Sequence, residues 1–413
     1  MRNWNKVVLL GIWLLLPHLS LSQDTTQVAP PKPKKRLKQQ KDPNAPKKWA
    51  LNGYLKYLTS VYFLQQPNPT ILQDNLIHNR LNFSWYPSDH WTFKAELRTR
   101  VFFGEFIKLQ PNFGRSILRG DSLKNGYTDY LSWALLDERG GVIHSTLDRI
   151  YFQYSKGNWD LRIGRQRINW GINTIWNPND IFNTFSFTDF DYEERPGSDA
   201  VRLQYFTGVA SSIEFAVKAF TSWENATAGF LWKTNRWEYD FQVLAGIFQQ
   251  HLVFGGGWEG AIKGAGFKGE FSYFYDTRPD SSQRHSFAGA ISVDYLFPSR
   301  TYLIAGFLYN SNGSITANAT ELFGYQPSAK NVYPYRYAVF LTFSQPIKEI
   351  FSIGLTAIYS PGESHSLFVN PTFTYTISEQ WDLSLIGQVA FNRLGNQYIS
   401  PLQVAFLRFK LSF

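Results

Sequence analysis

The sequence contains no cysteine. This absence excludes disulfide cross-links, thiolate catalysis and the attachment of a lipid to a cysteine. Long apolar runs are equally scarce: beyond residues 7–16, no stretch approaches the roughly 20 apolar residues of a membrane-spanning helix. A chain of 413 residues is nevertheless long enough for one large closed sheet or for two soluble domains.

A net basic charge is also missing from most of the chain. The formal charge of the whole sequence is +9, but ten of its 41 Lys and Arg residues and only two of its 32 Asp and Glu residues lie within residues 1–50. That leaves 31 basic and 30 acidic residues for the remainder. Because nucleic-acid binding requires a basic patch on the folded domain, we expect no nucleic-acid partner.

The first 48 residues have the composition of a leader and a spacer. Two basic residues precede the apolar run, and the residues Ser-Leu-Ser at 20–22 form a cleavage site. Residues 1–22 therefore predict a secretory signal peptide. Residues 23–48 are rich in Pro, Lys and Gln, which predicts a disordered periplasmic spacer. A tether to an anionic surface is the alternative for this segment.

From residue 49 onward the dominant pattern is an alternation with a period of two residues, which is typical of strands. In residues 91–103, apolar side chains alternate with Lys94, Glu96, Arg98 and Arg100. Charges at every second position do not fit the packed core of a sandwich, but they can face a water-filled lumen. We therefore predict an all-β fold, a transmembrane antiparallel β-barrel of about 18 strands, with 16 as the alternative, over residues 49–413.

The predicted strands cover residues 50–63, 75–86, 91–103, 146–155, 159–169, 199–206, 211–222, 226–234, 236–248, 251–258, 261–276, 285–296, 301–310, 335–344, 349–359, 365–377, 381–392 and 402–413. Their connections alternate between short turns and long loops, as expected for a barrel whose two ends differ. The long loops are predicted at 104–145, 171–198, 277–284, 311–334 and 393–401. Six tryptophans lie beside the short turns, where an interfacial aromatic girdle would sit: Trp85, Trp91, Trp159, Trp232, Trp237 and Trp381.

The last strand alternates in the same way. Its outward positions end with Phe409, Leu411 and Phe413, and Arg408 and Lys410 lie between them. This pattern resembles the C-terminal strand of outer-membrane β-barrels. The resemblance implies that Phe409, Leu411 and Phe413 form an insertion signal for the barrel-assembly machinery. An amphipathic edge strand that ends a soluble domain is the alternative.

Three short motifs occur in the middle of the chain: RIGRQRINWG at 162–171, WNPNDIFN at 176–183 and ERPGSDAVRL at 194–203. This series resembles Gram-negative outer-membrane porin-like proteins and, more distantly, the alginate-export type of 18-stranded barrel. The resemblance covers about 45 residues directly. It implies the fold and a location in the Gram-negative cell outer membrane, but it does not identify a substrate.

Continued alternation would place Arg165 and Arg167 on the lipid face, so a β-bulge at Gly164 is predicted to turn both inward. A basic arc on the first and last strands is predicted to face an acidic arc on the middle strands, which includes Glu214, Glu238 and Glu270. Local ion pairing is the alternative to a field across the lumen. The candidate pore-lining residues are Arg80, Lys94, Glu96, Arg98, Arg100, Arg149, Arg162, Arg165, Arg167 and Arg202.

Two loops are candidates for narrowing the barrel. The loop at 171–198 could fold against the wall and pair its acids with the arginines, or it could only be stapled to the rim. Its candidate residues are Trp176, Asn177, Asp180, Asn183, Glu194, Arg195 and Asp199. The loop at 104–145 holds Tyr127, Tyr130, Leu131, Trp133, Leu135 and Leu136. These residues are too apolar for a free outer loop and predict a plug in the barrel mouth or a docking surface.

These patterns predict a porin-like channel for passive diffusion of small hydrophilic, and in part anionic, solutes. A plugged barrel for export or surface assembly is one alternative, and an outer-membrane hydrolase is another. Adjacent His and Ser residues at 144–145, 285–286 and 365–366 would point to opposite faces of a strand, so we predict no catalytic residues. We expect no cofactor and no metal site. The expected partners are outer-membrane lipid, lipopolysaccharide, the assembly machinery and the solutes, and the oligomeric state is left open.

Overall fold

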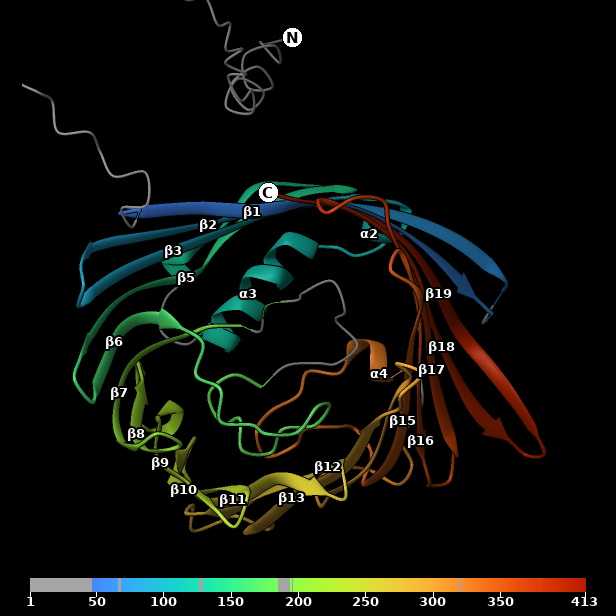
Figure 1. The fold of residues 1–413 in the computed structure, drawn as a ribbon. Helices are drawn as coiled ribbons and strands as arrows, with labels where there is room; N and C mark the ends of the chain where they lie inside the picture. The colour runs from blue at the N-terminus through green and yellow to red at the C-terminus, as the bar shows by residue number, and fades with distance from the viewer. Residues whose placement is uncertain (1–46, 66–67, 126–128, 185–193, 195, 319–320) are drawn as a thin grey trace, which may run out of the picture. The chain divides into compact units, whose positions relative to one another are not determined.

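The alternating segments build one antiparallel sheet that closes on itself (Figure 1). The computed structural model describes residues 47–65, 68–125, 129–184, 194, 196–318 and 321–413. The described residues belong to a single unit, residues 47–413. The predicted signal peptide and nearly all of the predicted spacer lie outside the described residues, so both remain predictions.

Nineteen strands form the sheet. Their bounds are β1 Trp49–Leu64, β2 Thr70–Ser88, β3 Trp91–Gly104, β4 Ser132–Glu138, β5 Gly141–Lys156, β6 Trp159–Gln166, β7 Ser198–Gly208, β8 Ser211–Lys218, β9 Thr227–Arg236, β10 Tyr239–Phe248, β11 His251–Ile262, β12 Ala265–Asp276, β13 His285–Leu296, β14 Tyr302–Asn310, β15 Tyr337–Lys348, β16 Phe351–Ser360, β17 Ser366–Thr376, β18 Trp381–Leu394 and β19 Gln397–Ser412. The described helical segments are α2 Glu105–Lys108, α3 Phe113–Asn125, η2 Asp129–Leu131, η3 Trp223–Asn225 and α4 Glu321–Gly324. Within the described ranges, no helix combines the length and the apolar character needed to cross a membrane.

The barrel closes where the first strand meets the last. β1 pairs with β19 from Tyr54↔Ser412 to Leu64↔Leu402. Beyond that ladder, Phe413 and Gly53 exchange two backbone hydrogen bonds of 2.9 and 3.0 Å. Because β1 also pairs with β2, neither edge of the sheet is left open at this seam.

The predicted fold class is confirmed: eighteen strands form the closed wall, and each of the eighteen predicted ranges overlaps one of them. The additional strand, β4, was missed. It pairs with residues 141–146 of β5, and β6 pairs with residues 150–156 on the same edge of that strand. β4 therefore continues the wall beyond the end of β6. The prediction of a long loop at 393–401 was wrong, because β18 and β19 extend to Leu394 and Gln397 and leave only a tight turn between them.

The prediction that the apolar residues of the loop at 104–145 plug the barrel mouth was wrong, and the alternative of a docking surface stays a prediction. The apolar residues Trp133, Leu135 and Leu136 lie on β4 and are exposed rather than folded into the barrel mouth. Tyr127 lies outside the described residues. Instead, the helix α3 lies inside the ring of strands, where Figure 1 shows it crossing the interior. An edge-to-face contact between the rings of Phe102 and Phe113, with ring centres 5.2 Å apart, holds its start against the end of β3.

The two faces of the wall differ as the alternation requires. On β13, Phe287, Ile291 and Val293 are exposed on the outer face, whereas Ala288 and Ala290 are buried inside. The interior itself has two different sides, which the sequence analysis did not predict. The wall from β1 to β7 presents mainly polar and charged side chains to the interior, whereas much of the wall from β9 to β18 presents small or apolar ones.

The apolar side of the interior is covered by two connections that fold inward. Residues 167–184, between β6 and β7, are called the inner loop below. The second is the connection between β14 and β15, which contains α4. Its residues Leu322, Tyr333 and Tyr335 pack with Trp176 of the inner loop against Ile304 and Leu308 of the wall. One side of the barrel interior therefore resembles the core of a soluble protein.

The packing of β1 against β2 predicts that two glycines differ in how well they tolerate replacement by alanine. A Cβ at Gly53 would lie 2.1 Å from the carbonyl oxygen of Arg80 on β2, whereas a Cβ at Gly354 on β16 would have no heavy atom nearer than 3.7 Å. We expect Gly53→Ala to cost about 1–3 kcal/mol of barrel stability through overpacking. Gly354→Ala should be nearly neutral. The stability of both variants can be measured by urea unfolding, followed as loss of the heat-modifiable band on a gel. Equal unfolding midpoints for the two variants would contradict the close packing of β1 against β2.

Candidate functional site

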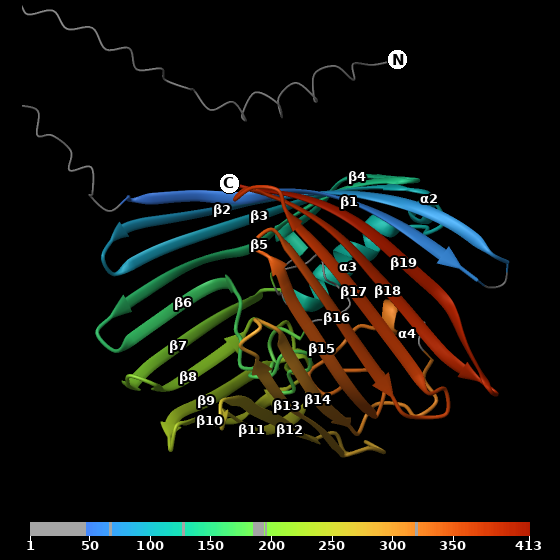
Figure 2. The same ribbon diagram turned by 45° about the vertical axis from the view of Figure 1, so that its right-hand side comes forward.

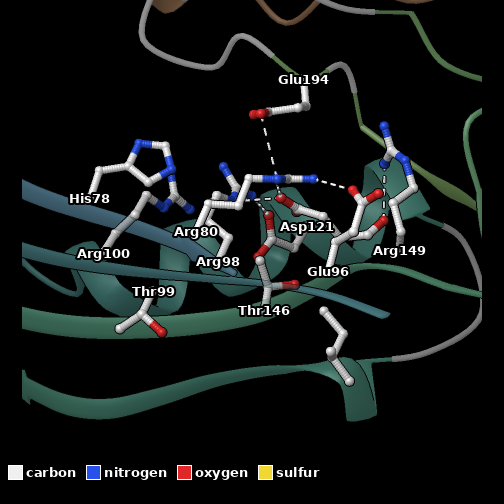
Figure 3. Close-up of polar contacts among 12 residues, drawn as sticks. His78, Arg80, Glu96, Arg98, Thr99, Arg100, Asp121, Thr146, Arg149 and Glu194 are labelled. Carbon is white, nitrogen blue, oxygen red and sulfur yellow. Dashed lines mark hydrogen bonds and ion pairs between the residues drawn. The ribbon is translucent and has the colours of Figure 1, made fainter. Parts of the chain in front are cut away.

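Arginine and histidine side chains of β2, β3 and β5 converge on one part of the interior (Figure 3). We call this group the basic wall: His78, Arg80, Arg98, Arg100, His144 and Arg149. The strand register places Arg80 directly opposite Arg98 and His78 directly opposite Arg100. Like charges directly opposite each other destabilise a sheet, so the pair Arg80 and Arg98 requires counter-charges nearby.

The first counter-charge comes from a β-bulge. Glu96 pairs with Arg149 and the next residue, Leu97, pairs with Leu147, so the backbone register between β3 and β5 skips Asp148. The extra residue lets both Asp148 and Arg149 lie buried on the interior side. The Asp148 carboxylate lies 2.5 Å from Nη1 of Arg80 and 3.0 Å from Nε of Arg98.

Arg80 binds three carboxylates from three parts of the chain. Besides Asp148, it contacts Glu96 at 2.5 Å on the neighbouring strand and Glu194 at 3.5 Å from the connection between β6 and β7. The hydroxyl of Tyr54 on β1 also donates a hydrogen bond of 2.9 Å to Glu194. Glu194 therefore joins the far connection to the basic wall, as the dashed line in Figure 3 shows.

The helix α3 supplies a further counter-charge through Asp121. Its carboxylate lies 2.8 Å from Nε2 of His144 and 3.9 Å from Nη2 of Arg98. Nδ1 of His144 lies 3.2 Å from Nη2 of Arg100, which can only donate, so the imidazole accepts there and donates to Asp121. Burial raises the pKa of Asp121, but the hydrogen bond from His144 and the charges of Arg100 and Arg98 outweigh it and hold that pKa below its usual range. Asp121 is therefore a fixed negative charge inside the barrel.

Farther around the wall, three more of the candidate arginines have acidic partners. Arg165 binds Asp199 through two hydrogen bonds of 2.7 and 3.0 Å. Arg202 lies 2.8 Å from Glu214, and Arg162 lies 3.3 Å from Asp160. Lys94 lies on the same inner face, opposite Ser84 and Tyr151, and Arg167 follows β6 and donates to Asn169 at 2.7 Å.

The predicted bulge at Gly164 was wrong. The register of β6 runs without a shift against both β5 and β7. Yet Ile163 is exposed on the outer face and Arg165 is fully buried, so the change of face occurs at Gly164 itself. The φ angle of Gly164 is +121°, and a Cβ there would lie 2.3 Å from the carbonyl oxygen of Ile150. Only glycine fits this conformation and this close approach.

The inner loop is held to the wall by hydrogen bonds from several strands. The indole Nε1 of Trp170 donates to Glu214 on β8 at 2.6 Å, and the backbone N–H of Ile172 donates to Glu270 on β12 at 2.5 Å. Farther along, the side-chain amide of Asn179 donates to the carbonyl oxygen of Gly256 on β11 at 3.0 Å. These bonds satisfy polar groups that the loop buries, as a loop inside a protein requires.

Glycines in the wall make room for this loop. A Cβ at Gly255 would lie 2.5 Å from Oδ1 of Asn179, and one at Gly257 would lie 2.7 Å from Cδ1 of Ile172. A Cβ at Gly229 on β9 would lie 2.7 Å from the Trp170 ring. Three glycines in a row, residues 255–257, interrupt the side-chain pattern of the predicted strand at 251–258. This glycine run forms the part of β11 that the inner loop contacts closely.

The other candidate constriction residues mostly stabilise the inner loop. Asp180 accepts hydrogen bonds from the backbone N–H groups of Trp170 and Gly171. Asn183 accepts one from the N–H of Ile168 and donates to Ser198. Trp176 and Asn177 are buried, and the Trp176 ring packs edge-on against that of Tyr333. Arg195 lies outside the described residues.

The predicted field across the lumen does not fit these contacts. Arg80, Arg98, Arg165 and Arg202 each have a carboxylate within 3.0 Å. On the acidic side, Glu214 and Glu270 bind the inner loop, and Glu238 lies in the turn between β9 and β10 rather than on a strand. Local pairing, the alternative interpretation, accounts for most of these charges.

Two residues that hold this site together were missed in the sequence, and a third was assigned a different role. Asp148 is not among the predicted residues, although strict alternation with the inward Arg149 would place its carboxylate in lipid and so would have indicated a bulge. Asp121 lies on a helix that the strand pattern did not reveal. Glu270 was counted as a lumen charge, whereas it is fully buried beneath the inner loop.

Comparisons with known proteins agree with the fold. No protein-family model matches the chain, and a search of curated proteins found no match. Similar solved structures include OccAB4 of Acinetobacter baumannii, with 8% identity and a TM-score of 0.57 over 90% of this chain and 100% of that one. The outer membrane protein OprD of Pseudomonas aeruginosa has 8% identity and a TM-score of 0.54 over 89% and 93%. OccK11 (OpdR) of the same organism has 8% and 0.53 over 88% and 96%. At this identity the likeness establishes the fold alone.

The contacts of the inner loop predict the effect of removing its main anchor. Trp170 is 1% exposed, so Trp170→Ala should cost about 3–5 kcal/mol of packing and leave the loop loosely held. We expect trypsin to cleave this variant after Arg167, the one Lys or Arg in the inner loop, while the barrel keeps its heat-resistant mobility. The matched control is Trp223→Ala in η3, where the side chain is 72% exposed. Equal resistance of the two variants to trypsin would show that Trp170 does not anchor the loop.

Proposed function

We propose that the protein is an outer-membrane channel for the passive diffusion of small hydrophilic solutes, including anions. The observation that carries this proposal is a closed barrel with an apolar outer face and a charged inner wall. Lipid requires the apolar face, and lumen water solvates the charges on the other. The similarity in fold to the outer membrane protein OprD supports the same location.

The two-sided interior suggests where solutes pass. The inner loop and the connection between β14 and β15 cover the wall from β9 to β18 with apolar contacts. We infer that solutes pass along the basic wall, on the side of the interior where α3 lies. In this proposal the candidate pore-lining residues act there, and Lys94, Glu96, Arg100 and Arg162 set selectivity from partly exposed positions on the inner face.

The finer assignments belong to the same proposal. The motif series at 162–203 suggests a relationship to Gram-negative porin-like proteins and, distantly, to alginate-export barrels. Phe409, Leu411 and Phe413 are proposed to interact with the barrel-assembly machinery during insertion. Lipid and lipopolysaccharide would contact the outer face, and the channel function requires no catalytic activity.

One observation favours a second function. The inward-folded connections bury Trp176, Tyr333 and Tyr335 in a continuous core with the wall. A barrel filled in this way could serve export or surface assembly instead of diffusion. Conductance distinguishes the two functions directly.

The experiment is a planar-bilayer recording of the purified protein. The channel proposal predicts discrete steps of current that are smaller than those expected of an unobstructed 18-stranded barrel, because the inward connections occupy part of the interior. A folded, inserted protein that passes no current would refute diffusion and favour the second function.

Asp121 provides a test of selectivity. Asp121→Asn keeps the shape and the ability to accept a hydrogen bond from His144, but it removes the negative charge that faces Arg98 and Arg100. We expect the reversal potential in a salt gradient to shift toward anions, because the cations of the basic wall become less compensated. The control is Glu138→Gln at the exposed end of β4. If the two variants give the same reversal potential as the parent, the ion path does not run beside α3.

A further inference from the structure

An apolar hollow lies on the outer face of the barrel, away from the site described above. Its lining residues come from four neighbouring strands: Trp49 of β1, Phe83 and Trp85 of β2, Phe93 of β3 and Phe152 of β5. Cross-strand pairing places Trp49, Trp85, Phe93 and Phe152 in one row around the barrel. Trp49 is 60% exposed and Phe152 is 52% exposed, so the hollow opens outward.

A small residue, Ala95, lies beside the hollow in the strand register. In the next row, Ala95 lies between Phe83 and Ile150. Its methyl group leaves a gap among large rings. The Phe83 and Phe93 ring centres are 6.5 Å apart, and those of Phe93 and Phe152 are 4.8 Å apart. The rings therefore border the hollow on the outer face, to which the methyl group of Ala95, two residues from Phe93 on the same strand, also points.

Two cations lie at the rim of the hollow. Lys47 and Lys48 are exposed and directly precede Trp49. The backbone N–H of Tyr86 donates a hydrogen bond of 2.8 Å to the carbonyl oxygen of Lys48, which fixes this part of the chain beside β2. The lysines are thus held next to the apolar hollow rather than on a free tail.

The hollow lies at the short-turn end of the barrel. Figure 2 shows this end on the left, where β1 begins and where the turns between β2 and β3 and between β5 and β6 lie. The exposed Trp91 and Trp159 lie beside those turns. Exposed tryptophans at the ends of barrel strands indicate the level of the membrane interface, where lipid headgroups meet acyl chains.

We propose that this hollow binds one anionic phospholipid, with an acyl chain among the five aromatic side chains and the phosphate beside Lys47 and Lys48. The proposal rests on the membrane location given under Proposed function, but not on conductance. The combination of an apolar slot and two adjacent cations matches the two chemically different parts of such a lipid. A second copy of the chain fits less well, since a stable protein interface uses about 20–30 residues on each side and the hollow offers five.

The test is native mass spectrometry of the purified protein in detergent micelles with added phosphatidylglycerol or phosphatidylcholine. We expect one phosphatidylglycerol molecule to remain bound in preference to phosphatidylcholine. Ala95→Phe fills the hollow and should lower the bound fraction at least fivefold. Ala305→Phe, at an exposed outer position on β14, is the matched control and should bind as the parent does.

The lysines are tested separately by Lys47→Ser combined with Lys48→Ser, which leaves the wall intact. This variant should lose the preference for phosphatidylglycerol, and it keeps the proposal testable if Ala95→Phe does not fold. Equal lipid binding by the parent and both variants would overturn the proposal, as would a dimer mass that Ala95→Phe abolishes. Because lipid retention is measured without current, failure here differs from failure of the channel function.

Discussion

The whole structure depends on the closure of one antiparallel sheet. With β1 bonded to both β2 and β19, each of the eighteen strands of the closed wall has two neighbours in the ladder, while β4 adds to it by pairing with β5. The backbone of the closed wall therefore needs no water. Closure also forces each side chain to one of two faces. The charged residues of β2, β3 and β5 then share one interior, and the chain must neutralise them there.

The need to neutralise these charges explains the side-chain contacts on the charged side of the interior. Asp148 in its bulge, Glu96, Glu194 and Asp121 all surround the guanidinium groups of Arg80 and Arg98. Burying a charge without a partner costs several kcal/mol, so the bulge and the inward helix stabilise a wall that strand alternation alone would leave with opposed like charges. On the other side the interior is stabilised differently, because small wall residues allow the aromatic side chains of two connections to pack as a core.

Strand alternation carries its information locally, which is why the sequence predicted the barrel. Eighteen strands, the short turns and the outward tryptophans all follow from period two and from turn residues. The site was harder to predict, because it depends on breaks in that period and on contacts between distant segments. Gly164 was recognised as a break, but a positive φ angle and not a bulge reverses the face. The reason for Gly255 and Gly257 could not be predicted, because the residues that they contact, Asn179 and Ile172, lie far away in the sequence. The leader, the spacer, the insertion signal and the role of Arg195 remain predictions.

The central claim is that β3 separates lipid from a water-filled interior at every second residue. The absence of cysteine from the chain allows a direct measurement, in which single cysteines at Lys94, Glu96, Phe93 and Ala95 are exposed in outer membranes to a membrane-impermeant thiol reagent. The structure predicts labelling at Lys94 and Glu96 and protection at Phe93 and Ala95. Equal labelling at all four positions would contradict a lipid-facing outer row, and protection at all four would contradict an interior that is open to water.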